Sequence, residues 1–295
     1  MKDFIILTDS TSDLGKDLRD KYNIEYVKMN ITYDGKELPA SLDWDLYSAK
    51  ELYDIMRKGT RIMTTQVPMN AYEEAFTKAI KEGKGVLYIS CSSALSGSVN
   101  TAYTVKQNLL EEYPDAEIEI VDSLISCLGQ GLLVCDAAKL RSEGKSLQEV
   151  SQYIEENKLK VNQFATVESL EYLKRAGRVK SSSAFFGNIF SVKPIIISDI
   201  KGNNYAYRKV KGRRTSLLEL CEEVKNNIID PENQIIGIGH ADSLEDANFI
   251  KEHLEKEIKC AGFYINYIGP IVGASVGPGT IGVYFKGKEV TILGE

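Results

Sequence analysis

Residues 86–103 read VLYISCSSALSGSVNTAY. The stretch begins with four apolar residues, which is typical of a buried parallel strand. Helical spacing begins near Val99, and the turn in between carries five serines and a single glycine, Gly97. The stretch therefore predicts a strand that leads into a helix through a turn rich in hydroxyl groups.

The same order of strand, polar turn and helix occurs at two other places. Residues 4–7 form an apolar run that ends in the polar segment 8–13, and residues 118–121 lead into Asp122, Ser123 and a helical stretch. Such alternation predicts a parallel sheet that is covered by helices.

The pattern changes beyond about residue 160. Residues 192–200 and 205–210 are two β-prone runs with a hairpin signal between them. Two further apolar strands surround the glycine-rich segment 269–279, which we expect to be a loop. The sheet in this half of the chain is therefore expected to be mixed or antiparallel.

The length of 295 residues favours two domains, because a single core usually stops growing near or below this size. We expect the fold class α/β, with an N-terminal parallel-sheet domain over residues 1–162 and a C-terminal mixed-sheet domain over residues 163–295. A cleft for a ligand is expected between the two domains.

Composition argues against several classes of protein. The chain has 36 basic and 42 acidic residues and a net charge of -6, which argues against nucleic-acid binding. Its five cysteines form no C-x-x-C pair, so they predict neither a zinc site nor a disulfide framework. No apolar run has the length of a signal sequence or a membrane span, and a cytoplasmic location is expected.

Ser96 lacks the surroundings of a catalytic nucleophile. The α/β-hydrolase elbow G-x-S-x-G would need glycines where Ala94 and Ser98 stand. The chain also lacks a Walker A motif and a complete G-x-G-x-x-G motif, which argues against binding of ATP or NAD. No carboxylate pair has the spacing of metal ligands, and we expect Asp9 and Asp13 to mark the start of a helix.

The sequence contains two histidines, His240 and His253. His253 lies in a predicted helix among charged neighbours and is expected at the surface. His240 follows a predicted strand, where catalysis is one interpretation and local hydrogen bonding before the next helix is the other.

The turn around Ser96 offers hydroxyl groups, free N–H groups at a helix start and a close backbone approach at Gly97. Thr64 and Thr65 precede another predicted helix. Because ligands of open α/β sheets bind at the ends of parallel strands, the two turns could face each other across a sheet edge. This pattern suits the oxygens of an anion, although helix capping would explain the same residues.

Six segments carry a more specific signal. They are TDSTSDL (8–14), TTQVP (64–68), SSALSGS (92–98), LKRAGRV (173–179), VKPII (192–196) and GPIVGASVGPG (269–279). In this order, and over the whole length of the chain, they resemble the DegV family, which comprises bacterial proteins that bind fatty acids and present acyl chains to a fatty acid kinase.

The resemblance implies a long-chain fatty acid in a tunnel between two α/β domains, and it implies no cofactor and no metal. Thr64 and Ser96 match the threonine and serine that hydrogen-bond the carboxylate, and Ser275 is expected to join them. The supporting positions are Thr65, Ser93, Gly97 and Gly273. On this basis the chain would carry a ligand to a fatty acid kinase and would not itself be an enzyme.

One position departs from the family pattern. Many members have G-T-H-x-G-P-G in the last glycine loop, with the histidine reaching the carboxyl group, whereas Ser275 stands in the place of that histidine. The substitution bears on the strength of head-group binding and on any role of a histidine in transfer.

The most basic run is residues 209–214, KVKGRR, where Arg213 and Arg214 are candidates for docking to an acidic kinase surface or, transiently, to anionic lipid headgroups. A solvated loop is the alternative.

Two rival functions also stay open. One is a kinase or phosphotransferase subunit for a small polar substrate, similar to the dihydroxyacetone kinases, and the other is a regulatory module that senses a lipid.

Overall fold

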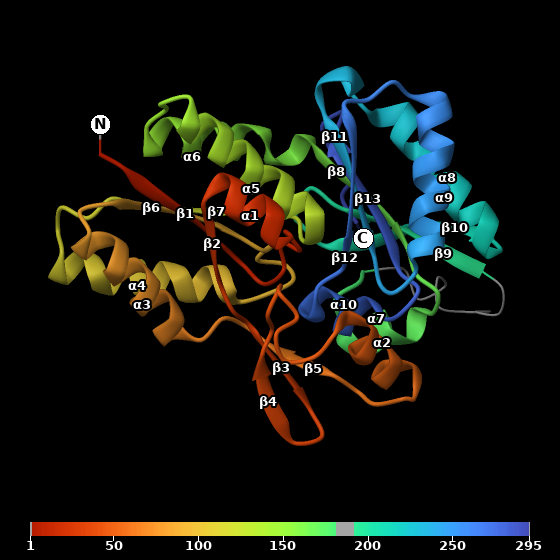
Figure 1. The fold of residues 1–295 in the computed structure, drawn as a ribbon, viewed down its shortest axis with the longest axis horizontal. Coiled ribbons are helices and arrows are strands. Elements are labelled where there is room, and N and C mark those ends of the chain that lie inside the picture. The colour runs from red at the N-terminus through yellow and green to blue at the C-terminus, as the bar shows by residue number, and fades with distance from the viewer. Residues whose placement is uncertain (1, 181–191, 295) are drawn as a thin grey trace.

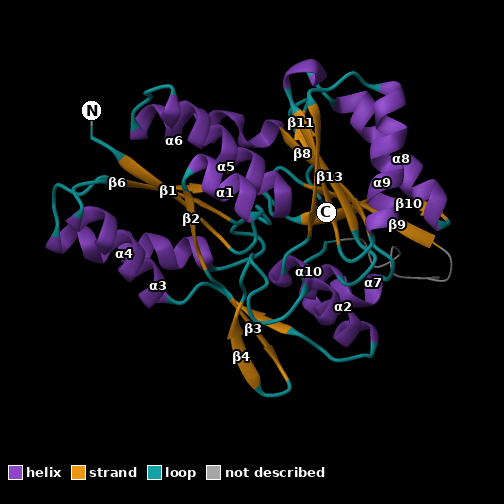
Figure 2. Cartoon of the chain, in the orientation of Figure 1, coloured by secondary structure: helices purple, strands orange, loops and turns teal. Residues whose placement is uncertain are grey.

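The structure is a computed structural model that describes residues 2–180 and 192–294. It contains two large β-sheets covered by helices and a small third sheet that projects from them (Figure 1). The first large sheet is wholly parallel and the second is mixed, as Figure 2 shows by element type. The predicted α/β class, with a parallel N-terminal and a mixed C-terminal sheet, is confirmed.

The strands of the parallel sheet, in spatial order, are β2 (Ile24–Val27), β1 (Phe4–Asp9), β6 (Gly85–Ser90) and β7 (Ile118–Asp122). Three of them belong to the predicted strand–turn–helix units, and the fourth, β2, was not predicted. Every residue of β1 and β6 is buried, because helices cover both faces of the sheet.

Two helices, α3 (Met69–Lys81) and α4 (Ser98–Glu112), pack on one face of this sheet. The other face is covered by α1 (Lys16–Tyr22), α5 (Cys127–Ser142) and α6 (Leu147–Asn157). α5 also contacts the second sheet, so it lies between the two sheets (Figure 1). This position explains why most residues of α5 are buried.

The mixed sheet forms the C-terminal half of the molecule. Its strands, in spatial order, are β10 (Asn204–Lys211), β9 (Val192–Ser198), β8 (Val161–Thr166), β13 (Ile281–Lys286), β11 (Ile235–His240) and β12 (Gly262–Tyr267). β9 and β10 pair antiparallel, which confirms the predicted hairpin. The predicted domain boundary after residue 162 falls within β8 and stays a prediction.

Helices α8 (Arg213–Asn227) and α9 (Leu244–Glu257) cover the outer face of the mixed sheet. Their apolar residues join those of the strands in one buried cluster that includes Leu217, Leu220 and Ile250. No helix in the described ranges has both the length and the apolar character needed to cross a membrane.

A three-stranded antiparallel sheet was not predicted. Its strands, in spatial order, are β4 (Lys36–Pro39), β3 (Asn30–Tyr33) and β5 (Met63–Thr65). It projects beside α2 (Ala49–Arg57) and near α7 (Leu170–Ala176) and α10 (Pro270–Val276) (Figure 1). These strands are only three or four residues long, and only one residue in them is buried, so they lack a clear apolar alternation.

α10 lies within residues 269–279, which we expected to be a loop. Pro270 occupies the first helical turn, where its missing N–H costs nothing, and Gly273 N–H donates to the Gly269 carbonyl at 2.8 Å. Ile271 and Ala274 are buried in the core. Tertiary packing therefore overrides the low helix propensity of a glycine-rich segment.

One hydrophobic core joins the two halves of the molecule. It contains Tyr53 and Phe76 from the N-terminal half together with Ile268 and Tyr284 from the C-terminal half. Across this junction the Tyr53 hydroxyl donates to the Ile268 carbonyl at 2.6 Å. The site residues described below lie at this junction.

Candidate functional site

The three predicted head-group residues line one cavity of about 130 Å³. Thr64 lies in β5, Ser96 lies in the turn between β6 and α4, and Ser275 lies in α10. We call this space the hydroxyl cavity. The structure thus brings together three hydroxyl groups that are far apart in the sequence.

Two of the four supporting residues, Thr65 and Gly97, also line the hydroxyl cavity. Ser93 is exposed and outside it, and its backbone N–H donates to Asp122. Gly273 is buried where α10 crosses α2, and a Cβ at this position would lie only 2.4 Å from the Tyr53 hydroxyl. Gly273 therefore allows the close approach of the two helices.

Hydrogen bonds hold the turn around Ser96 in place. The Ser96 hydroxyl oxygen accepts from the Ser98 N–H at 3.2 Å and lies 2.9 Å from the Ser98 hydroxyl oxygen. Ser98 in turn accepts from the Val67 N–H at 3.2 Å. Since residue 67 follows β5 closely, this bond ties the turn of Ser96 to the strand that carries Thr64.

The rest of the hydroxyl cavity has a strongly apolar side. The apolar residues of its wall are Met29, Leu95, Ile271, Val272 and Val276. A ligand with a polar group that takes hydrogen bonds and an attached apolar part would match this division.

Sequence reasoning missed five polar residues of the hydroxyl cavity, namely Thr11, Gln66, Ser126, Arg178 and Asn204. Ser126 directly precedes α5, and its hydroxyl makes no capping bond there. Ser126 stands in a turn between a strand and a helix, as Ser96 does, so the same sequence pattern could have identified it. Arg178 lies in the LKRAGRV motif but was not assigned a role.

A second cavity, of about 240 Å³, opens beside the first. The two share Thr64, Arg178 and Ser275, and the second is also lined by the exposed side chains of Arg61 and Arg175. We call it the arginine cavity. Its lining contains three guanidinium groups and no carboxylate, which suits an anion.

Asp9 and Asp13 do not mark a helix start, contrary to expectation. α1 begins at Lys16, and its N-cap residue is Gly15. Asp9 ends β1 and is completely buried, and Asp13 adopts a left-handed conformation with φ of 50°. Both carboxylates belong to the interior of the molecule.

Burial raises the pKa of Asp13 from 3.8 to about 8. The Cys127 thiol and the Gly269 N–H lower this pKa in part, while the negative charge of Asp9 raises it further. Within residues 2–180 and 192–294, neither carboxylate oxygen of Asp13 has a hydrogen-bond partner of good geometry. Asp13 is therefore largely protonated at neutral pH.

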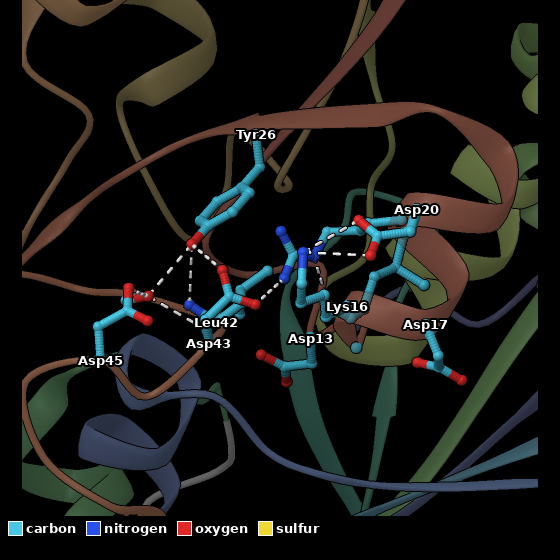
Figure 3. Close-up of polar contacts among 12 residues, drawn as sticks. Asp13, Lys16, Asp17, Asp20, Tyr26, Leu42, Asp43 and Asp45 are labelled. Atoms are coloured by element: carbon cyan, nitrogen blue, oxygen red, sulfur yellow. Dashed lines mark hydrogen bonds and ion pairs between the residues drawn. The ribbon is translucent and has the colours of Figure 1, made fainter.

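Other acidic side chains gather near Asp13 (Figure 3). Asp43 forms an ion pair with Arg19, and Asp45 accepts a hydrogen bond from Ser41 at 2.7 Å. Each of these carboxylates already has a partner. In the described part of the chain, no three His, Cys, Asp or Glu side chains are arranged to hold a metal ion.

His240 has a local structural role. It is 3% exposed, and its Nδ1 accepts from the N–H of Ser243, the residue before α9, at 3.3 Å. Burial lowers its pKa.

Cys91 lines the hydroxyl cavity, but burial raises its pKa and keeps it a thiol. The cavity thus offers neutral hydroxyl groups rather than an activated nucleophile.

The candidate docking residues make contacts within the chain. The Arg213 guanidinium donates to Asp246 at 2.6 and 2.9 Å and to the Gly279 carbonyl at 2.5 Å. Arg214 stacks over the ring of Phe249. A docking role for either arginine stays a prediction.

A family model described as "uncharacterised protein, DegV family" matches residues 3–288. The chain belongs to the DegV family. The DegV domain-containing protein CPE0026 of Clostridium perfringens is 39% identical over 287 residues, which cover 97% of this chain and 98% of that protein. The resemblance carried by the six sequence segments is therefore confirmed.

Solved structures of DegV proteins have the same fold. A fatty-acid-binding DegV family protein from Thermus thermophilus is 25% identical with a TM-score of 0.87, covering 97% of this chain and 100% of its own. DegV of Bacillus subtilis, also a fatty-acid-binding protein, is 25% identical with a TM-score of 0.81, covering 98% and 100%.

Proposed function

We propose that this DegV protein binds a long-chain fatty acid and holds its carboxyl group in the hydroxyl cavity. The observation that carries the proposal is the convergence of Thr64, Ser96 and Ser275 on one cavity that also has an apolar wall. The fatty-acid-binding relatives from Thermus thermophilus and Bacillus subtilis support it. The acyl tunnel between the sheets remains a prediction, and residues 181–191 lie outside the described part of the chain.

The tail and the head group of such a ligand contribute differently. Burying about fourteen methylene groups at roughly 0.8 kcal/mol each contributes about 11 kcal/mol before the cost of association. The head group must only recover the hydrogen bonds that it loses on leaving water. The apolar tail therefore supplies affinity, and the hydroxyl groups supply orientation.

The identity of the ligand is tested by native mass spectrometry of the purified protein and by analysis of an organic extract. A bound acid of C14 to C18 is the expected result. A small polar molecule in its place would favour the phosphotransferase subunit and would contradict the proposal.

Removing a head-group hydroxyl should weaken binding. Thr64→Val and Ser96→Ala are each expected to lower the affinity for a long-chain fatty acid by about 1–3 kcal/mol, or about 5- to 150-fold, because a head-group oxygen loses its partner. Isothermal titration calorimetry with delipidated protein measures the change. Ser93→Ala is the matched control, since that hydroxyl is exposed outside the cavity, and wild-type affinity in both test variants would remove the site assignment.

We further propose that the protein is a carrier, which presents the carboxyl group to a fatty acid kinase and does not itself form acyl phosphate. The arginine cavity supports this proposal, because it adjoins the head-group residues and suits the anionic phosphoryl donor of a partner. The cytoplasmic location stays a prediction, and so does the role of a carrier rather than a lipid sensor.

Arg61→Ala should slow acyl phosphate formation in the presence of a fatty acid kinase and ATP, by about tenfold, while fatty acid affinity stays unchanged. Arg61 lines the arginine cavity and not the hydroxyl cavity. Its replacement should therefore affect the presentation of the carboxyl group to the kinase without affecting fatty acid binding. A coupled assay for ADP measures the rate. ADP formation by the protein alone would contradict the carrier role.

A further inference from the structure

Ser126 places one more hydroxyl group on the wall of the hydroxyl cavity, and the proposed function does not use it. The residue is only 6% exposed and lines the cavity. It directly precedes α5, but its side chain does not cap that helix, and the described part of the chain offers its hydroxyl no other hydrogen-bond partner. Buried hydroxyl groups in proteins are normally paired. An unpaired one on a cavity wall therefore points to an atom of the ligand.

Two other polar residues of the cavity wall that the proposed function leaves unused, Thr11 and Asn204, differ from Ser126 in this respect. The Thr11 hydroxyl donates to the side-chain oxygen of Gln130 at 2.7 Å. The side-chain oxygen of Asn204 accepts from Gln163 at 3.0 Å. The hydrogen-bonding capacity of these two side chains is thus taken up at least in part by the protein, whereas that of Ser126 is left for the ligand.

The turn of Ser126 lies toward the mixed sheet. In this turn the Leu124 carbonyl accepts from the hydroxyl of Ser198 in β9 at 2.8 Å. The turn of Ser96 is tied instead to the strand of Thr64, by the hydrogen bond described above. A ligand that is held at Thr64 and Ser96 therefore meets Ser126 with the part of its chain that follows the carboxyl group.

The carboxyl group itself does not need Ser126. It has two oxygens, to which Thr64, Ser96 and Ser275 already offer three hydroxyl groups. Because the cavity has a volume of only about 130 Å³, a carboxyl group at these residues puts the first few carbon atoms of the chain near Ser126. A methylene group there would leave the Ser126 hydroxyl unpaired, which weakens binding. A hydroxyl group on the ligand would pair with it.

We propose that the preferred ligand is a fatty acid with a hydroxyl group on its second or third carbon atom, and that Ser126 binds this group. The inference rests on the proposed function and narrows the substrate class of the same cavity. A serine hydroxyl can donate to the ligand oxygen or accept from it. The N-terminus of the 16-residue helix α5 also favours an oxygen atom at this place, because it carries a partial positive charge.

Calorimetry with delipidated protein tests this inference. Palmitic acid is compared with 2-hydroxypalmitic acid and 3-hydroxypalmitic acid, each hydroxy acid as its two separate enantiomers. At least one hydroxy acid should bind the wild-type protein about three- to tenfold more tightly than palmitic acid, which is the size of one hydrogen bond. All these acids have the same chain length, so the apolar tail contributes similarly to each.

Ser126→Ala should remove the preference. Its affinity for the favoured hydroxy acid should fall to that of palmitic acid or below, whereas its affinity for palmitic acid should stay the same or rise, because no unpaired hydroxyl remains. Loss of a purely structural contact would weaken all the ligands alike. Ser142→Ala is the matched control, since Ser142 is exposed at the other end of α5, where its hydroxyl donates to the Lys139 carbonyl at 2.6 Å.

Palmitic acid that binds the wild-type protein at least as tightly as every hydroxy acid, or an unchanged preference in Ser126→Ala, would overturn the inference and leave the proposed function standing. Failure of the wild-type protein to bind any of these acids would overturn the proposed function itself. If Ser126→Ala does not fold, Ser126→Gly takes its place, because glycine is well accepted directly before a helix.

Discussion

Asp13→Asn should stabilise the protein by an amount that grows between pH 4 and pH 8. In the folded state Asp13 has a pKa of about 8, whereas its ordinary value is 3.8. Between these values the folded chain holds a proton that the unfolded chain has released, so stability falls as the pH rises. The loss is about 1.4 kcal/mol for each pH unit crossed and levels off above pH 8.

Asparagine is a close match for Asp13 in shape, and it tolerates the positive φ of 50° at this position. Asparagine cannot ionise, so the free energy of unfolding of the variant does not fall in this way as the pH rises. Denaturant unfolding followed by circular dichroism at pH 4.5, 6, 7 and 8.5 measures the difference. We expect the variant to exceed wild type by a few kcal/mol at pH 8.5, on the order of the linkage above.

Asp20→Asn serves as the control, because Asp20 is exposed and pairs with Lys16 on the surface of α1 (Figure 3). Its effect on stability should not grow with pH in the same way. A constant difference between Asp13→Asn and wild type over the whole range would mean that Asp13 is already ionised in the folded protein.

Val272→Glu should reduce the affinity for a long-chain fatty acid at least about 100-fold at pH 7.5, which corresponds to about 2.7 kcal/mol. Val272 belongs to the apolar wall of the hydroxyl cavity. A glutamate there removes apolar contact with the ligand and leaves an unpaired carboxylate in a space that the ligand desolvates.

Val272 is partly exposed, so the fold should accept the change, and a thermal melt checks this. Val272→Thr is the control, since it introduces a polar group of similar size without a charge and should lower affinity by less than Val272→Glu does. If Val272→Glu binds like wild type, the acyl chain does not pass along α10 and the assignment of the cavity is wrong.

The position of Ser96 was predictable because its turn joins a buried strand to a helix, and both patterns extend over only a few residues. The same signal at Ser126 was overlooked, although it stands between β7 and α5 in the same way. Sequence reasoning also took Asp9 and Asp13 for residues at a helix start. Polar residues after a strand look alike in sequence whether they cap a helix or enter the interior.

The basic run at Arg213 and Arg214 illustrates a different difficulty. Charge alone suggested a free surface, but Arg213 is bound to Asp246 and to the loop at Gly279. The partners of a long side chain come from other parts of the chain, and no local pattern reveals them.

The three strand–turn–helix units that begin at residues 4, 86 and 118, the parallel arrangement of the first sheet and the family of this protein were determined by the sequence alone. Periodicity, capping residues and motifs act over short segments, so they can be read without coordinates. Tertiary packing alone decided that α5 lies between the sheets and that a glycine-rich segment forms α10. Those contacts, made between distant segments, bring Thr64, Ser96 and Ser275 to one cavity and enclose Asp9 beneath it.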